Sequence, residues 1–327
     1  EFHERLVGSE MCIRDRYKMV VTTHTDAGAT LALFTSKELQ NAKAWTLQEP
    51  LYTDPNIWVM ECADVFKEGE YWYLTYSDVA DRKVHYRYAK SLKGPWTKPA
   101  NDIFDGIAFY AGKTMSNGTE RYLAGWCPTR IGDGDEDQWG GSLVCHRMLF
   151  NADGTIDLKL PDGIDKKFTT LKKTVLIDKS GKAVKKEDSY VLSDVASVSF
   201  PRLDKTCKIE ATVKATGNDD AFGFAFGACD DKTEVYSIRF DLKNKQLVMS
   251  KDDLTRGTTP TQTNVALTVP ADKLFKVKIV AEKSVCVMYV NDKIAFSNRI
   301  DKMPKNPWAI FTDKGTEISF SDIKVYE

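Results

Sequence analysis

The sequence predicts an all-β protein with a propeller-like N-terminal domain followed by a C-terminal β-sandwich. Short apolar and aromatic runs recur from Tyr17 onward, separated by turn sequences such as KEGE, LKGPW and NADGT. Almost no segment shows the helical apolar period of about 3.6 residues. In the last third of the chain, apolar and polar residues alternate in one short run after another, which is typical of an antiparallel sandwich.

The N-terminal domain is expected over residues 17–165. Its predicted strands are 17–23, 29–36, 58–66, 71–77, 84–91, 109–115, 121–127 and 141–150. The segments 33–51 and 86–104 share one order of residues: an aromatic residue, then Ser and Lys, then Trp-Thr, then Pro. Such a recurrence is expected when an inner strand, a turn and an outer strand repeat in successive propeller blades.

The second half of the chain changes in texture. Residues 166–190 are rich in lysine with little periodicity, and we interpret them as a linker or crossover. Residues 191–327 contain the alternating runs and are expected to form the sandwich. Residues 1–16 show neither period and no apolar stretch of a signal peptide. The run VGSEMCIRDR resembles a translated adapter sequence, so we expect 1–16 to be artefactual or disordered and the natural protein to begin upstream.

Composition excludes several function classes. The chain has 46 basic and 47 acidic residues, for a net charge of −1, so it lacks the basic excess expected of a nucleic-acid-binding protein. No apolar run reaches the roughly 18 residues of a membrane-spanning helix. The 7 cysteines are scattered, without a CxxC pair. We therefore predict no metal site, no cofactor, no nucleic-acid partner and no membrane partner.

The stretch WVMECADVF (58–66) places a carboxylate inside an apparent strand. Glu61 lies between Met60 and Cys62, with Trp58 close by. An ionised carboxylate among apolar groups is unfavourable unless it is paired, protonated or part of a site. Glu61 is therefore the first candidate for a functional acid.

These residues resemble glycoside hydrolase family 32, the β-fructofuranosidases. Glu61-Cys62-Ala63-Asp64 resembles the family's Glu-Cys-Pro-Asp acid/base motif, with Ala63 in place of proline. The segments that resemble other family motifs are GIAFYAGKT (106–114), RYLAGW (121–126), WGGSLVCHRML (139–149) and VCVMYVNDKIAFSNRI (285–300). The resemblance covers residues 17–327. It implies a five-bladed propeller, with the first blade and part of the second missing, joined to a β-sandwich.

The resemblance implies hydrolysis of β-fructofuranosides, sucrose or fructans such as inulin and levan, by a retaining mechanism. Glu61 would be the general acid/base, since a proton donor benefits from an apolar environment. The family's nucleophile is an aspartate in a Trp-Met-Asn-Asp-Pro-type motif, which this sequence does not contain. We reject Thr53-Asp54-Pro55-Asn56 as that motif and interpret Arg14-Asp15-Arg16 as a chance match to the family's Arg-Asp-Pro. The chain itself is therefore expected to be inactive.

Further residues are candidates for substrate binding, each with a structural alternative. Asp64 faces away from Glu61 in a regular strand, and only a bulge or strand end would bring both to one site. Tyr110 and Lys113 would reach the sugar or serve as core and surface residues. Trp126 and Trp139 would stack on the sugar or pack the blades. We expect His146 to be structural and the acidic loop 131–139 to be a solvated rim.

Two alternatives remain open at this level. A propeller hydrolase of family 43, acting on arabinan or xylan, shares the YAKSLKGPW segment and would be inverting. A non-catalytic carbohydrate-binding protein is the other. The partner is a fructose-containing sugar in the preferred interpretation. A fructan would favour secretion or the periplasm, and sucrose or its phosphate the cytoplasm.

Overall fold

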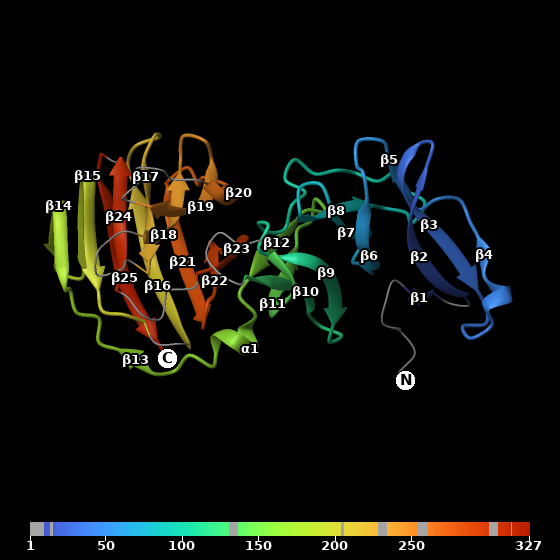
Figure 1. Ribbon diagram of the computed structural model, residues 1–327, viewed down its shortest axis with the longest axis horizontal. Coiled ribbons are helices and arrows are strands. Elements are labelled where there is room, and N and C mark those ends of the chain that lie inside the picture. Colours follow the sequence, from blue (N-terminus) through green and yellow to red (C-terminus); the bar gives the residue numbers. More distant parts are fainter. Residues whose placement is uncertain are drawn as a thin grey trace. The chain divides into compact units, whose positions relative to one another are not determined.

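The computed structural model describes residues 10–13, 16–130, 137–203, 206–227, 234–253, 261–300, 307–314 and 316–327 (Figure 1). The prediction of an all-β protein is confirmed for these residues, because helix is confined to η1 (Ala42–Ala44) and α1 (Asp162–Asp165). No helix in the described part has the length and apolar content needed to span a membrane. The chain divides into two compact units, Glu1–Trp126 with Leu143–Asp157, and Cys127–Ser142 with Leu158–Glu327.

Three small antiparallel sheets come first among the described residues. The first contains β1 (Glu10–Ile13), β2 (Arg16–Thr25), β3 (Gly28–Ser36), β4 (Thr46–Leu47) and β5 (Tyr52–Asp54). The second contains β6 (Met60–Glu68), β7 (Tyr71–Asp78) and β8 (Lys83–Ala89). The third contains β9 (Tyr110–Ser116), β10 (Arg121–Arg130), β11 (Asp137–Phe150) and β12 (Ile156–Lys159). Sequential strands are neighbours within the second and third sheets, as in propeller blades.

The first and second sheets share an apolar core. Leu31 of the first sheet and Met60, Leu74 and Tyr76 of the second are fully buried in one cluster. Glycine is required where β3 approaches a neighbouring segment, because a Cβ at Gly28 would lie 2.6 Å from the carbonyl oxygen of Asp54. The core thus fixes one face of the β6–β8 sheet and leaves its other face to β9.

The remaining strands form one large antiparallel sheet that folds as a sandwich. Its central path runs in the order β20-β19-β18-β17-β24-β15-β25-β16-β21-β22-β23. The bounds are β13 (Leu171–Lys172), β14 (Asp178–Lys186), β15 (Ser189–Phe200), β16 (Thr206–Ala215), β17 (Ala221–Phe226), β18 (Glu234–Asp241), β19 (Gln246–Asp253), β20 (Thr261–Ala266), β21 (Leu274–Glu282), β22 (Val285–Val290), β23 (Ile294–Arg299), β24 (Trp308–Lys314) and β25 (Ile318–Tyr326).

Alternation builds the sandwich core. In β21, Phe275 and Ile279 are buried whereas Lys276 is exposed, so one face of the strand meets the core. Aromatic rings fill the interior: Phe200 stacks on Trp308 with ring centroids 4.5 Å apart. The alternation of apolar and polar residues that predicted this domain therefore matches the alternation of buried and exposed side chains along β21.

Residues 166–190 differ from the predicted linker, because β14 pairs along its whole length with β15 (Figure 1). Only Ala183 of β14 is buried, and the other residues of that strand are exposed. A strand exposed on both faces does not need alternating apolar and polar residues. The lysine-rich sequence of β14 therefore gave no strand signal.

Candidate active site

A β-bulge at the start of β6 sets the position of Glu61. Glu61 lies opposite Ser77 of β7, and Asp64 lies opposite Thr75, so one extra residue is inserted between them. Cys62, inside the bulge, has a left-handed φ of 51°. Residues that face each other across an antiparallel pair project to the same side, so Glu61 and Asp64 share one face of the sheet. The bulge that would be needed to bring Glu61 and Asp64 to one face is therefore present.

A second bulge lies at the start of β9. Tyr110 faces Trp126 of β10, and Lys113 faces Ala124, with a register shift between the two pairs. Ala111 has a left-handed φ of 55°. By the same parity, Tyr110 and Lys113 project from one face of the third sheet. The two bulges therefore turn four sequence-predicted side chains toward the space between β6 and β9.

Hydrogen bonds join these two strands. The Tyr110 hydroxyl donates to Oε2 of Glu61 at 2.8 Å. The Lys113 ammonium donates to the carbonyl oxygen of Ala63 at 2.6 Å. Thr114 donates to Oδ2 of Asp64 twice, from its amide at 2.9 Å and from its hydroxyl at 2.7 Å. Asp64 and Lys113 are thus engaged with the protein, while Glu61 keeps a second carboxylate oxygen with no hydrogen bond from the described residues.

Two side chains pack around the Tyr110 ring that contacts Glu61. The indole of Trp126 meets the Tyr110 ring edge-on, with centroids 6.1 Å apart and an interplanar angle of 86°. The Arg82 guanidinium lies 6.0 Å from the centroid of the same ring. Burial, together with the hydrogen bond and the charge of Glu61, raises the pKa of Tyr110, so this phenol stays protonated and remains a donor.

The apolar surroundings of Glu61 differ in one respect from expectation. Met60 is fully buried and burial raises the pKa of the Cys62 thiol, but Trp58 is 66% exposed. β6 begins at Met60, so Trp58 lies before the strand and its ring meets solvent. The aromatic residue that contacts Glu61 is therefore Tyr110, which comes from the next sheet and packs against Trp126.

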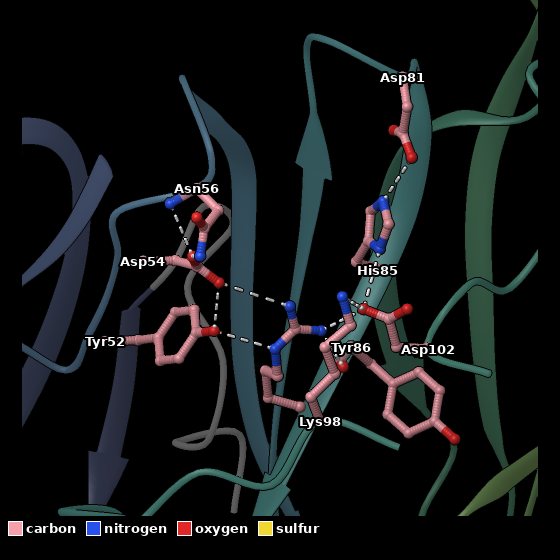
Figure 2. A network of polar contacts seen from close by, with 9 residues as sticks. Tyr52, Asp54, Asn56, Asp81, His85, Tyr86, Lys98 and Asp102 are labelled. Atoms are coloured by element: carbon pink, nitrogen blue, oxygen red, sulfur yellow. Dashed lines mark hydrogen bonds and ion pairs between the residues drawn. The ribbon is translucent and has the colours of Figure 1, made fainter. Parts of the chain in front are cut away.

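The opposite face of the β6–β8 sheet carries a polar network (Figure 2). Arg87 faces Leu74, whereas Glu61 faces Ser77, and these two positions of β7 project to opposite sides. Arg87 is 1% exposed, and its Nε donates to the Tyr52 hydroxyl at 3.0 Å.

The same network includes Asp54 of the rejected Thr53-Asp54-Pro55-Asn56 segment. Its Oδ2 accepts from the Tyr52 hydroxyl at 2.8 Å and lies 3.8 Å from the Arg87 guanidinium. The hydrogen bonds to Asp54 lower the pKa of that carboxyl despite partial burial. Asp54 is thus an ionised structural carboxylate that contacts Arg87 on the face opposite Glu61, which supports the rejection.

His85 and Asp102 complete this network. Nδ1 of His85 lies 3.0 Å from Oδ2 of Asp102, and Nε2 lies 3.0 Å from Oδ2 of Asp81. Asp102 also pairs with Arg87. Burial opposes charge at both sites, but the pairing prevails: it raises the pKa of His85 to about 9 and lowers that of Asp102 to about 2.

The other candidate residues lie elsewhere. His146 is fully buried, with Nε2 3.0 Å from Oδ2 of the fully buried Asp105, an arrangement typical of a structural histidine. Trp139 belongs to β11, but its side chain lies outside the described residues. Loop residues 131–136 and the pair Arg14-Asp15 also lie outside them.

Sequence reasoning missed the partners of the predicted residues. Thr114 ends the GIAFYAGKT segment, but that segment did not mark it as a partner of Asp64, and Arg87 lies in none of the motif segments. Strand pairing brings Thr114 to Asp64 and Arg87 to Asp54. Arg87 in YRYAK and Asp102 in PANDIF were not singled out in the sequence. The signal that could have raised suspicion is a charged residue inside an aromatic strand, the same signal that singled out Glu61.

The comparison with protein families now decides the relationship. A family model described as GH32, BT1760-like, C-terminal domain matches residues 154–325, more than half of the chain. The chain belongs to glycoside hydrolase family 32. The matched residues lie mostly in the sandwich and do not include Glu61. The relationship of the Glu61 site to the family therefore rests on the likeness of the fold.

Solved structures of family 32 share the fold. The Bombyx mori GH32 β-fructofuranosidase aligns with 97% of this chain and 64% of its own, at 15% identity and a TM-score of 0.67. The A. japonicus fructosyltransferase aligns with 97% and 66%, at 13% identity and 0.72. The Lactobacillus gasseri sucrose-6-phosphate hydrolase aligns with 97% and 64%, at 15% identity and 0.66.

These likenesses extend over both halves of the chain, which spans just under two thirds of the length of these relatives. A mutant of the Bombyx mori enzyme was solved in complex with sucrose. A search of curated protein sequences found no significant match. At this level of identity the likeness establishes the family 32 fold alone.

Proposed function

We propose that the chain carries the acid/base part of a β-fructofuranosidase active site, with Glu61 as the proton donor. The supporting observation is the half-buried Glu61 carboxylate, presented by the β6 bulge and oriented by the Tyr110 hydroxyl at 2.8 Å. One oxygen is held and the other is available, which is what proton transfer to a bound sugar requires.

The proposed reaction is retaining hydrolysis of a β-fructofuranoside such as sucrose, inulin or levan. Glu61 protonates the glycosidic oxygen as a second carboxylate attacks the anomeric carbon, and then takes a proton from the water that releases fructose. The two carboxyl groups of such enzymes lie about 5–5.5 Å apart. Tyr110 and Trp126 are the proposed sugar contacts, joined by Trp139; Asp64 and Lys113 would act by holding the bulges in place.

We further propose that the three small sheets are blades of a five-bladed propeller of which the first blade and part of the second are missing. Residues 17–165 form this partial domain. Residues 191–327 form most of the sandwich, and the connection 166–190 contributes β13 and β14 to the same sheet. Family membership and the sequential strand order within the second and third sheets support this assignment. The family model that matches the chain is one of family 32, which favours this assignment over the family 43 alternative.

The nucleophile is the missing part in this proposal. The sequence contains no Trp-Met-Asn-Asp-Pro-type motif, and Asp54 is held by Tyr52 and Arg87 on the opposite face from Glu61. The chain alone is therefore expected to bind a fructose-containing sugar without hydrolysing it. The non-catalytic carbohydrate-binding alternative therefore applies to this chain by itself and not to a version extended upstream.

The test compares the chain with a version extended upstream of Tyr17 by its genomic sequence. We expect fructose release from sucrose, inulin or levan by the extended version and none by the present chain. In the extended version, Glu61→Gln should lower kcat about 10²–10⁴-fold. Glu70→Gln, at an exposed glutamate in the next turn, is the matched control and should leave kcat unchanged.

Chemical rescue separates loss of the acid/base from loss of folding. In the extended version, azide should restore turnover of an activated fructoside by Glu61→Ala, because azide attacks the covalent fructosyl intermediate without needing a general base and releases fructosyl azide and the free nucleophile carboxylate. Fructose release by the present chain, or full activity of Glu61→Gln in the extended version, would overturn the proposal. Arabinan hydrolysis in place of fructan hydrolysis would overturn the substrate class.

A further inference from the structure

Three potential metal ligands meet at the hairpin between β7 and β8. Asp78 is the last residue of β7, Asp81 lies in the turn, and His85 follows in β8. One ligand atom of each lies within 4.8 Å of the ligand atoms of the other two. The hairpin register brings them together, because Asp78 pairs with Lys83 and Tyr76 pairs with His85.

The turn itself orients both carboxylates. Oδ1 of Asp78 accepts a hydrogen bond from the amide of Ala80 at 2.9 Å. Oδ1 of Asp81 accepts one from the amide of Lys83 at 3.0 Å. The second oxygen of Asp81 lies 3.0 Å from Nε2 of His85, and that of Asp78 has no hydrogen bond or ion pair with the described residues. Each carboxylate is therefore anchored through one oxygen and presents the other.

An independent feature prepares His85 for a metal. The imidazole is 8% exposed, and its Nδ1 lies 3.0 Å from Oδ2 of Asp102. Asp102 is held in turn by the buried Arg87. Histidine ligands in metalloproteins usually donate their second ring N–H to a carboxylate, which fixes the tautomer and aims the other nitrogen at the metal. Asp102 occupies that place, outside the cluster of ligands.

We propose that Asp78, Asp81 and His85 bind one divalent transition-metal cation of the zinc type. Tetrahedral zinc holds nitrogen and oxygen ligands at about 2.0–2.2 Å, which puts neighbouring ligand atoms roughly 3.3 Å apart. The 3.0 Å between Nε2 of His85 and Oδ2 of Asp81 is close to that spacing. An imidazole in the set favours zinc, cobalt or nickel over calcium and magnesium, which prefer oxygen ligands alone. Water would complete the coordination.

The proposed site is structural and braces the end of the sheet that presents Glu61. Asp78 pairs with Met60, the residue before Glu61. Asp78 and Met60 therefore project from the same face of the sheet, and Glu61 projects from the other. The same turn carries Arg82, whose guanidinium lies 6.0 Å from the centroid of the Tyr110 ring. A bound cation would tie both strands of the hairpin to the turn between them and so restrict the segment that positions Arg82.

The test is a titration of the whole chain with Zn²⁺ at pH 7.5 and at pH 9, followed by calorimetry and by thermal unfolding, because the pairing that raises the pKa of His85 to about 9 makes Zn²⁺ compete with a proton for Nε2. We expect one equivalent to bind and Tm to rise by roughly 5 °C at a hundredfold excess over Kd. Asp78→Asn and Asp81→Asn should each raise Kd at least tenfold. Both substitutions keep an oxygen for the turn amide and leave His85 and Asp102 in place, so the metal-free fold is preserved.

Asp153→Asn is the matched control, because Asp153 accepts the same kind of turn hydrogen bond, from the amide of Thr155 at 3.0 Å. It should leave Kd unchanged, as should His24→Gln at an exposed histidine. Co²⁺ bound at the site should give visible bands without the charge-transfer band of a thiolate. Failure to bind one equivalent, undiminished binding by both Asn variants, or a thiolate band would each overturn the proposal.

Discussion

The hydroxyl of Tyr110 donates a 2.8 Å hydrogen bond to Oε2 of Glu61, although the two residues belong to different sheets. Each is placed by a bulge whose inner residue has a left-handed φ, 51° at Cys62 and 55° at Ala111. Neither bulge alone would produce the contact, since each controls only one partner. The geometry of the proposed acid/base therefore depends on two local irregularities that match.

The contact between Tyr110 and Glu61 should be measurable as a coupling free energy. A double-mutant cycle with Tyr110→Phe, Glu61→Ala and the double variant, read by urea unfolding of this chain, should give about 1–2 kcal/mol. Tyr110→Phe removes only the hydroxyl, so ring packing against Trp126 persists. Strictly additive effects would show that the hydrogen bond does not contribute to stability.

The left-handed backbone at Ala111 predicts an unusual response to glycine. Ala111→Gly should be neutral or stabilising, because glycine adopts a positive φ without the steric cost of a Cβ. The same change at Ala124, on the neighbouring strand and without a positive φ, should be destabilising. Urea unfolding should separate the two variants by about 1–2 kcal/mol. Equal losses at both positions would contradict a strained bulge.

A buried hydroxyl at Thr75 should be dispensable. Its side chain is fully buried and its Oγ1 has no hydrogen-bond partner among the described residues. Thr75→Val keeps the shape and removes the unpaired hydroxyl, so stability should rise by about 1 kcal/mol. Thr114→Val is the contrasting change, because that hydroxyl donates to Asp64, and it should be destabilising. A loss of stability at Thr75 would reveal a partner such as an ordered water.

Asp165 should give the sandwich a pH-dependent contribution. Burial opposes its charge, but hydrogen bonds from Lys208 and Lys278 lower the pKa of Asp165. A carboxyl with a depressed folded pKa stabilises the fold above its unfolded pKa of about 3.9 and loses that contribution as pH falls through the folded value. Asp165→Asn should therefore cost about 1 kcal/mol at pH 7 and progressively less as pH falls below 4.

Unfolding in urea at several pH values between 7 and 3 would measure this difference. Asp188→Asn is the control, because Asp188 is exposed and has no ion pair with the described residues. Its effect should be small and constant with pH. A cost for Asp165→Asn that persists unchanged at pH 3 would indicate a packing effect rather than the loss of a charge pair.

Local pattern sufficed for most of the fold. The predicted strands of the N-terminal half lie close to β2, β3 and β6–β11, because aromatic runs and Gly/Asn/Asp turns act over a few residues. β14 escaped notice, since an exposed strand rich in lysine carries no alternation. Trp58 was expected beside Glu61 as part of a strand that in fact begins two residues later.

The site was predictable only in part. Glu61 stood out as a carboxylate among apolar residues, but its contact with Tyr110 depends on backbone torsions at Cys62 and Ala111, two residues with no turn preference. The network around Arg87 depends on which strands become neighbours. That pairing depends on residues far apart in the sequence, so no local pattern predicts it. The sequence therefore identified the candidate acid, whereas its contacts depend on how the strands of the three sheets pair.

The exposed strand β14 has a consequence for the behaviour of the protein in solution. Among the described residues it pairs with β15 alone, so its outer side is a row of peptide groups able to pair with a strand of another molecule. Its lysines at 179, 182, 185 and 186 make such an approach a meeting of like charges. Acetylation of those side chains would remove the repulsion while leaving the fold intact, and would turn this edge into a starting point for aggregation.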